Sequence, residues 1–299
     1  MAGDSLRVLF LGTPEFAVPT LRALVASRHR VAGVLTQPDR PRGRGQRVAP
    51  GPVKAVAADL GLRLWQPDRL REPGLLDELR GLDLDLGVVA AYGKILPGDF
   101  LSIPRLGTIN VHASLLPRWR GASPVHHAVA AGDAETGVTI MRIVQALDAG
   151  AMFASVGRPI GPQETAGEVE AAIAALGAPL LVEVVNQIAA GTAVETPQDE
   201  RLVTYAPRLT KDDGVIDWRR PARALQCFVR GMQPWPGAIT WLGSERWLVR
   251  RAAVADGHQL AAAPASIVEA RGDRLVVACG EGTALAVTEL QPEGKRAMS

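Results

Sequence analysis

Cysteine is scarce in this sequence of 299 residues. The only two, Cys227 and Cys279, lie far apart and do not form a CxxC pair. Two isolated cysteines cannot make a zinc site by themselves, and they do not resemble a disulfide framework. Because reducing compartments keep thiols free, we expect both cysteines to be reduced in an intracellular protein.

Long apolar runs and a strong excess of one charge are also lacking. No uninterrupted run reaches the roughly 18 apolar residues that predict a membrane-spanning helix. The apolar run near the start, in MAGDSLRVLFLG, is too short and too acidic at its beginning for a secretory signal. The net charge is only +2, so the chain is not a polycation, although a local basic patch remains compatible with it. We therefore expect a soluble, cytoplasmic protein that does not bind membranes. We also expect a monomer, although neither charge nor hydropathy determines the oligomeric state.

The first half of the chain alternates between strand-like and helix-like patterns. The motif LGTPEF follows the first strand and lacks both GxGxxG and GxxxxGK, which argues against a dinucleotide or ATP site. Continuous apolar strands are typical of a parallel sheet covered by helices on both faces. We predict a doubly wound, mostly parallel α/β sheet with strands at 7–11, 31–36, 64–66, 84–91, 107–113 and 137–143, and helices at 52–60 and 165–190.

The pattern changes after residue 190. Residues 191–207 are polar and rich in turn formers, which suggests a linker. A short helix at 221–230 is followed by strand-like runs at regular spacing, as in a small antiparallel β-barrel or sandwich. We therefore predict a catalytic domain at 1–190, a linker at 191–207 and a β domain at 208–299.

The segment INVHASLLPRWRGASPV carries the most specific chemistry. Strand alternation places Asn110 and His112 on the same face at the end of a strand, and Asp148 follows a later strand. Ligands of open α/β sheets bind beyond the carboxyl ends of the strands. There, the Asn110 amide and a His112 N–H can stabilise the oxyanion formed when an amine attacks a formyl carbon, and Asp148 can orient His112 and help move the proton. This chemistry needs neither a metal nor a covalent intermediate, and we expect no metal.

These residues resemble the active site of the folate-dependent formyltransferases. The longer motifs NVHASLLPRWRGASPV, LGTPEFAVPTL, TQPDRPRGRG, AYGKILP and MQPWPGA are similar to the methionyl-tRNA formyltransferase branch of that family. The resemblance implies a Rossmann-like domain linked to an OB-like β-barrel that holds tRNA. It implies 10-formyltetrahydrofolate as formyl donor and methionyl initiator tRNA as acceptor. It also implies that Asn110, His112 and Asp148 are catalytic and that Ser114, Leu115, Leu116 and Pro117 contact folate.

A basic loop extends from Pro38 to Lys54. It contains Arg40, Arg42, Arg44 and Arg47 and has Asp39 as its one acidic residue. A charge run is usually a solvated surface, but loops of this length are often functional. In the family that the chain resembles, this loop enters the acceptor stem of the tRNA, so we predict that the four arginines bind tRNA.

Two alternatives remain open. The first is a different folate enzyme, a formyltransferase for a purine precursor or amino-sugar nucleotide, or a deformylase; the basic loop and the second domain argue against a purine enzyme. The second is an RNA-binding module without activity, against which the intact Asn110, His112 and Asp148 argue. For other residues we expect ordinary roles: His126 and His127 on a partly exposed helix, and Trp235, Trp241 and Trp247 in core or turn packing rather than in base stacking.

Overall fold

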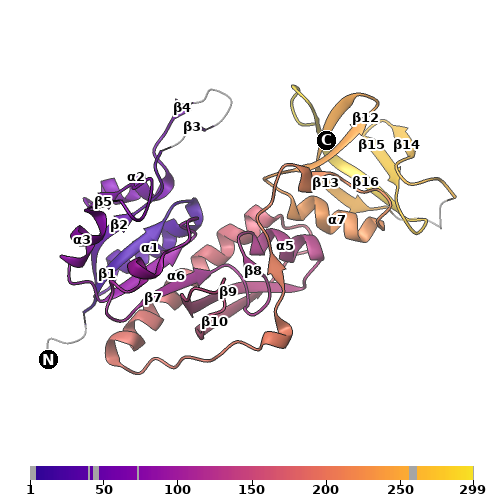
Figure 1. The fold of residues 1–299 in the computed structure, drawn as a ribbon. Coiled ribbons are helices and arrows are strands. Elements are labelled where there is room, and N and C mark those ends of the chain that lie inside the picture. Colours follow the sequence, from indigo (N-terminus) through magenta and orange to yellow (C-terminus); the bar gives the residue numbers. More distant parts are fainter. Residues whose placement is uncertain (1–4, 40, 43–46, 73, 256–260, 299) are drawn as a thin grey trace. The chain divides into compact units, whose positions relative to one another are not determined.

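A computed structural model describes residues 5–39, 41–42, 47–72, 74–255 and 261–298 (Figure 1). The contacts of the chain divide it into two compact units. The first comprises Met1–Gly121, Gly137–Arg158 and Glu170–Tyr205, and the second comprises Ala122–Thr136, Pro159–Val169 and Ala206–Ser299. The domain boundaries expected from the sequence stay a prediction.

A seven-stranded sheet forms the centre of the first unit, in the order β10-β9-β7-β6-β1-β2-β5. The strands β5, β2, β1, β6 and β7 run parallel to their neighbours, and β9 is antiparallel to β7. The predicted mostly parallel sheet is therefore confirmed. Its strands are β1 (Arg7–Gly12), β2 (Arg30–Leu35), β5 (Leu64–Trp65), β6 (Leu86–Ala90), β7 (Thr108–His112), β9 (Glu135–Arg142) and β10 (Met152–Pro159).

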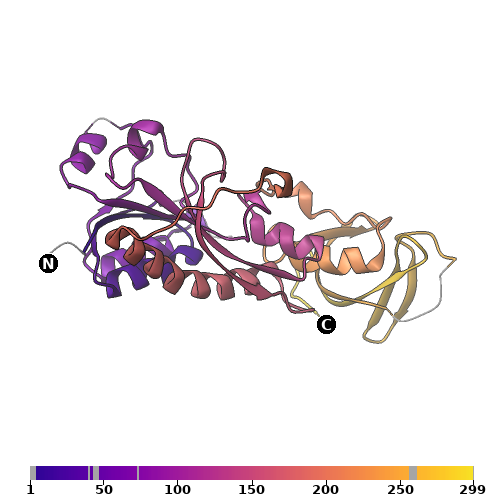
Figure 2. The same cartoon turned by 90° about the horizontal axis from the view of Figure 1, so that it is seen from below.

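Helices cover both faces of this sheet. Figure 2 shows α1 and the long α6 along one face. On the opposite face, Leu9 and Leu11 of β1 share a core cluster with side chains of α3 and α4, because alternate residues of a strand point to opposite sides. The helices of this region are α1 (Val18–Ala26), α2 (Pro52–Asp59), α3 (Leu75–Arg80), α4 (Gly98–Leu101) and α6 (Ala166–Ala190), with a 3-10 turn at Glu15–Ala17.

Helix α6 is long and apolar enough, by length and composition, to cross a membrane. Its sequence contains no uninterrupted run of about 18 apolar residues, because Glu183 interrupts it. In the structure Gly177 of α6 faces Val111 and Val138, and a Cβ on this glycine would stand 3.1–3.3 Å from their methyl groups. The small residue thus lets α6 pack closely against β7 and β9, which is the position of a core helix.

An antiparallel five-stranded sheet belongs to the second unit, in the order β12-β13-β16-β15-β14. Helix α7 packs against β13, and its buried face shares one core with the sheet. This is the small antiparallel β domain that the spacing of the strands predicts. Its elements are α5 (Pro124–Ala131), α7 (Ala222–Gly231), β12 (Ala238–Leu242), β13 (Glu245–Val254), β14 (Ile267–Arg271), β15 (Arg274–Ala278) and β16 (Ala284–Pro292).

The remaining elements are short. They are the strands β3 (Pro41–Arg42), β4 (Arg47–Val48), β8 (Arg120–Gly121) and β11 (Tyr205–Ala206), and 3-10 turns at Glu200–Leu202 and Asp212–Gly214.

One tryptophan of this unit differs from expectation. Trp235 is 49% exposed and lies in a turn, whereas Trp241 is 51% exposed and lies in a strand, so core packing is the wrong description of Trp241. Trp241 lies in β12, the edge strand of the five-stranded sheet, where it pairs with Arg246 of β13. An edge position leaves part of a large ring in water, which the apolar pattern of the strand does not reveal.

Both cysteines are buried and free, as expected from their spacing. Burial raises the pKa of the Cys279 thiol to about 11, because the thiolate would lose its hydration. The thiol therefore stays protonated near neutral pH and acts as a small apolar side chain.

Candidate active site

Strand β7 carries two of the three predicted catalytic residues at its carboxyl end. Asn110 and His112 project from one face of the strand, while Val111 between them faces α6. In the sheet, Asn110 is paired with Val89 of β6 and with Met141 of β9. The backbone at Asn110 is therefore hydrogen-bonded within the sheet on both sides, and this fixes the position of its Cβ atom.

The His112 ring is almost completely buried, with 4% of the residue exposed. Its Nε2 lies 3.0 Å from the carbonyl oxygen of Trp119. Because a carbonyl can only accept a hydrogen bond, Nε2 must carry the proton and donate it. In the neutral ring, Nδ1 is then the nitrogen with the free lone pair. This Nδ1 lies 3.8 Å from Oδ2 of Asp148.

The carboxylate of Asp148 accepts a hydrogen bond from a backbone amide. Its Oδ2 accepts a hydrogen bond of 2.8 Å from the amide of Gly121 in β8. Asp148 itself has a φ of +45°, in the left-handed region that costs a non-glycine residue roughly 1–3 kcal/mol. The surrounding contacts must therefore maintain this conformation. The structure brings His112 and Asp148 together, while their catalytic roles stay a prediction.

The predicted folate loop, Ser114 to Pro117, is fixed largely by its own hydrogen bonds. The Ser114 hydroxyl donates to the carbonyl of Arg118 at 2.6 Å. The Thr139 hydroxyl, on β9, donates to the Ser114 carbonyl at 2.8 Å and accepts from the Leu116 amide at 3.1 Å. Ser114 and Leu116 are buried, whereas Leu115 and Pro117 are partly exposed. Leu115 and Pro117 are thus the two members with side-chain surface available to a ligand.

Matches to known proteins cover nearly the whole chain. Residues 6–185 match the formyl transferase family, and residues 208–299 match the formyl transferase C-terminal domain. The chain belongs to the formyltransferase family. Relatives named methionyl-tRNA formyltransferase include one from Citrifermentans bemidjiense, 47% identical over 97% of this chain and 90% of the relative. Another, from Pseudomonas fluorescens strain SBW25, is 48% identical over 99% of this chain and 92% of the relative.

Solved structures with little sequence identity share the formyltransferase fold. The sugar 3N-formyl transferase WlaRD, with dTDP and 5-N-formyl-THF, superposes with a TM-score of 0.70 at 14% identity, covering 98% of this chain and 100% of that one. HypX from Aquifex aeolicus in complex with tetrahydrofolic acid has a TM-score of 0.60 at 18% identity, covering 98% of this chain and 45% of that one. Identities this low show the fold alone.

Part of the predicted tRNA-binding loop lies outside the described residues, namely Arg40 and Arg44. The backbone of Arg42 in β3 is paired with that of Arg47 in β4 in a short antiparallel ladder. At the base of the loop, Lys54 forms an ion pair with Asp39, whose other oxygen accepts from Gln66 at 3.0 Å. The hydrogen bond from Lys54 lowers the pKa of the Asp39 carboxyl. Lys54 is therefore engaged at the base of the loop.

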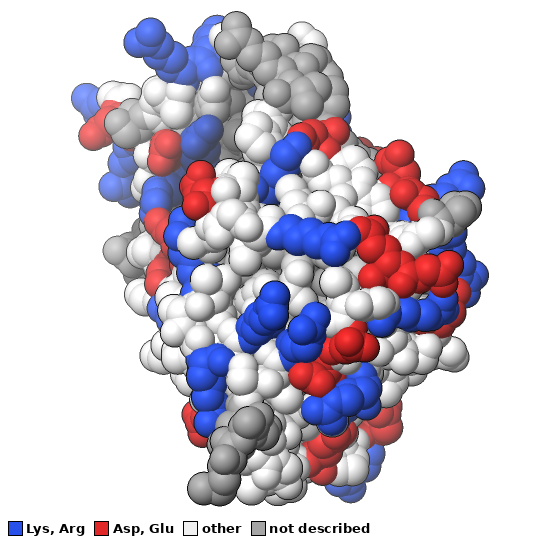
Figure 3. Space-filling view, turned by 90° about the vertical axis from the view of Figure 1, so that its left-hand side faces the viewer, with Lys and Arg blue, Asp and Glu red and all other residues white. Residues whose placement is uncertain are grey.

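Charge on the described surface is mixed. On the face in Figure 3, lysine and arginine side chains are interspersed with aspartates and glutamates. Within the first unit, Arg71 pairs with Asp99 and Arg105 pairs with Asp85. The exposed pair of Arg71 and Asp99 contributes little stability.

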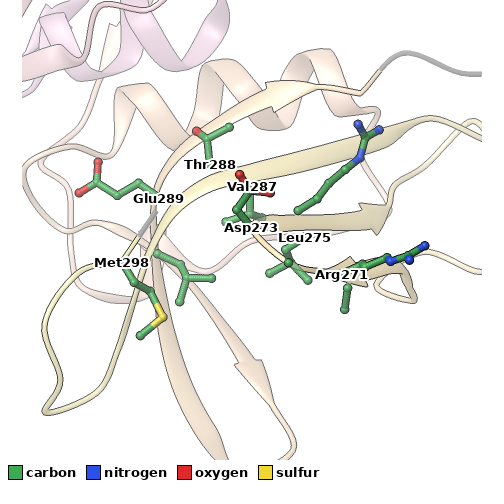
Figure 4. Close-up of a pocket in the computed structure, with 11 residues that line it drawn as sticks. Arg271, Asp273, Leu275, Val287, Thr288, Glu289 and Met298 are labelled. Atoms are coloured by element: carbon green, nitrogen blue, oxygen red, sulfur yellow. The ribbon is translucent and has the colours of Figure 1, made fainter.

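A cavity of about 270 Å³ lies at the end of the sheet in the second unit. Figure 4 shows Arg271 and Asp273 at the turn between β14 and β15, and Glu289 and Met298 on the other side. Its lining contains none of the predicted site residues. The candidate active site is therefore defined by side-chain convergence at the end of β7 and not by this cavity.

Several residues that support the site were not found from the sequence. Thr139 supports the loop at Ser114, and Gln198 and Thr204 come from the segment expected to be a linker. The polar, turn-rich composition of that segment does not distinguish a linker from a strap that crosses the site. The rings of His126 and His127 hydrogen-bond to the carbonyls of Gly231 and Pro207.

Proposed function

We propose that this formyltransferase moves the formyl group of 10-formyltetrahydrofolate onto the α-amino group of methionyl initiator tRNA, for the initiation of protein synthesis. The observation that supports the mechanism is that β7 carries Asn110 and His112 at its carboxyl end, where Nδ1 of His112 lies 3.8 Å from Oδ2 of Asp148. The choice of acceptor is supported by relatives of 47–48% identity that carry this activity in their name.

The Asn110 amide is the group that we assign to the oxyanion. When the amine attacks the formyl carbon, the new C–N bond pushes the carbonyl electrons onto oxygen. An amide N–H aimed at that oxygen stabilises the tetrahedral intermediate in a site that excludes water. Asn110 suits this role because its strand is paired on both sides, so the donor needs little reorganisation during the reaction.

His112 and Asp148 handle the proton. The attacking amine must lose a proton, and the neutral His112 ring offers the lone pair of Nδ1, since Nε2 donates to Trp119. The resulting imidazolium would face the Asp148 carboxylate, which balances its charge. When the intermediate collapses, the bond between the formyl carbon and N10 of the folate breaks, and N10 takes up the proton that Nδ1 of His112 had accepted, so the ring returns to its neutral form. No covalent intermediate with the protein is needed.

Folate as the donor is supported by the fold and by the loop at 114–117. The proteins WlaRD and HypX have this fold, and their solved structures contain folate compounds. In the present chain, the partly exposed Leu115 and Pro117 offer apolar surface beside Asn110 and His112 in the sequence. An apolar wall with a few polar groups is what a flat heterocycle requires.

Binding of tRNA is assigned to Arg40, Arg42, Arg44 and Arg47 and to the β domain at 208–299. Arginines suit phosphate because the guanidinium can donate two parallel hydrogen bonds. We place the enzyme in the cytoplasm, as a monomer. The domains proposed are 1–190 for catalysis, 191–207 as linker and 208–299 for tRNA.

One assay tests the function directly. Formyl transfer from 10-formyltetrahydrofolate is measured with methionyl initiator tRNA, methionyl elongator tRNA and an amino-sugar nucleotide as acceptors. We expect rapid transfer to the initiator only. Transfer to the sugar nucleotide, or formate release without any acceptor, would instead support one of the other folate enzymes.

A further inference from the structure

The segment at 196–204 crosses the candidate active site within the first unit. Thr196 pairs with Met152 at the start of β10. Farther along, the Thr204 hydroxyl accepts from the amide of Trp119 at 2.9 Å, and the Thr204 carbonyl accepts from the amide of Arg120, also at 2.9 Å. Trp119, whose carbonyl accepts the hydrogen bond from Nε2 of His112, is thus itself attached to this segment.

Gln198, in the middle of the segment, holds the backbone of the Asp148 loop. Its Nε2 donates to the carbonyl of Asp148 at 2.7 Å and to the carbonyl of Gly150 at 2.8 Å. Both N–H groups of the side-chain amide are therefore used on the loop that presents the carboxylate. Because the two hydrogen bonds reach two different carbonyls, they fix the orientation of the loop backbone as well as its position.

Arg120 fixes which way the Gln198 amide points. Its Nε and one terminal nitrogen donate to Oε1 of Gln198 at 3.0 and 2.9 Å. Because a guanidinium only donates, the oxygen of the amide must face Arg120 and the NH2 must face the loop. Arg120 is buried, with 3% exposed, and its charge is balanced by Glu200 at 2.8 Å.

The same short strand, β8, therefore holds Asp148 at two points. Gly121 donates its backbone N–H to the carboxylate, while the Arg120 side chain, acting through Gln198, holds the carbonyl. Asp148 has the left-handed φ of +45°, a conformation that persists only where neighbouring groups enforce it. Gln198 is the side chain in the described structure that contacts the Asp148 carbonyl.

We propose that Gln198 is a positioning residue: it holds Asp148 in the conformation that aims its carboxylate at His112. This inference rests on the proposed function, in which Asp148 supports proton transfer. A displacement of a catalytic group by about 1 Å can lower a rate by about 100-fold. Loss of the two hydrogen bonds should therefore lower kcat while the KM values for both substrates change little.

The test compares Gln198→Ala and Gln198→Glu with a matched control, Glu195→Ala. Gln198→Glu keeps the oxygen that faces Arg120 but replaces the donor with an oxygen opposite two carbonyls. Glu195 lies just before this segment and pairs with the Arg142 side chain, without a hydrogen bond to Asp148 among the described contacts. We expect both Gln198 variants to lose roughly 10- to 100-fold in kcat. Glu195→Ala should retain the wild-type kcat, and thermal unfolding identifies any variant that does not fold.

A double-mutant cycle separates positioning from a general structural role. If Gln198 acts through Asp148, then Gln198→Ala should cause no further loss of kcat in a chain that already carries Asp148→Asn. An equal loss on both backgrounds, or a wild-type kcat for folded Gln198→Glu, would overturn the inference and leave the proposed function intact. A wild-type kcat for Asp148→Asn itself would instead contradict the role of Asp148 in that function. Should Gln198→Ala fail to fold, Gln198→Glu carries both measurements.

Discussion

His112 and Asp148 approach each other through one atom pair, with Nδ1 lying 3.8 Å from Oδ2, while the opposite ring nitrogen donates to the Trp119 carbonyl. This distance exceeds that of a direct hydrogen bond. In the proposed mechanism, Nδ1 gains a proton during the reaction, and the Asp148 carboxylate would then face the charge of the imidazolium. This relationship motivates the first prediction.

Asp148→Asn should lower kcat by roughly 10²–10³-fold, the loss typical of one electrostatic contact to the transition state. The new amide can still accept from the Gly121 N–H, so the loop should keep its shape and only the charge is removed. Rates of formyl transfer are measured together with the unfolding temperature. His112→Ala and Asn110→Ala should cause comparable losses, and the combined losses should be less than multiplicative because the residues act as a unit. A folded Asp148→Asn enzyme with the wild-type kcat would contradict this assignment.

Thr139→Val should destabilise the folate loop. The substitution is nearly isosteric, but it leaves the Ser114 carbonyl and the Leu116 amide without their shared partner. A buried polar group without a partner costs roughly 1–3 kcal/mol, which urea unfolding can detect. We also expect the KM for the folate to rise above its wild-type value by a larger factor than the KM for tRNA does. Thr139→Ser keeps the hydroxyl and serves as the control; an equal rise in both KM values would show that the loop does not serve the folate.

Arg42→Ala should weaken tRNA binding and leave folate binding unchanged. If the arginine contacts one duplex phosphate, the slope of log K against log salt should fall by about 0.9. If it enters beside the unpaired end of the acceptor stem, discrimination between initiator and elongator tRNA should fall too. Both tRNAs are measured at two salt concentrations, with Lys54→Ala as a comparison because Lys54 is paired with Asp39. Unchanged affinity and discrimination for Arg42→Ala would leave tRNA recognition to the β domain.

His29 should make folding stability depend on pH. Burial lowers its pKa from 6.5, more than its hydrogen bond to Asn186 raises it, and Arg28 lowers it further. The ring accepts from the Leu6 amide at Nδ1 and hydrogen-bonds Asn186 through Nε2, so the folded state favours the neutral form. The unfolded chain binds this proton more readily than the folded chain does. The contribution of His29 to the free energy of unfolding is therefore fully present above about pH 6.5, and it is lost as the pH falls from there toward the lowered pKa of the folded state.

Urea unfolding between pH 8 and pH 5 measures this dependence. His29→Asn keeps an acceptor for the Leu6 amide but does not titrate, so its unfolding free energy should fall less over the same range. Identical pH profiles for the two proteins would show that other groups cause the acid destabilisation.

The sequence alone determined the sheet and the positions of its strands. Local information suffices there: apolar runs such as Leu86–Ala90 must be buried on both faces, and alternation places Asn110 and His112 on one side of β7. It missed β10, Met152–Pro159, because this edge strand is only partly buried and lacks a continuous apolar run. It described Trp241 wrongly for a related reason, since the edge position of a strand depends on pairing and not on its own residues.

Only the tertiary structure decided how the candidate site is held. The sequence predicted that Asp148 and His112 converge, but the proton on Nε2, the bond from Gly121 and the left-handed φ of Asp148 depend on atoms that meet after folding. The segment around Gln198 is the clearest case. Its polar composition predicts an exposed connection. The composition shows that these side chains can form hydrogen bonds, but it does not show which groups lie beside them in the folded chain. Folding brings Arg120 and the Asp148 loop to that side chain, and the same residues that would suit a linker then fix the site.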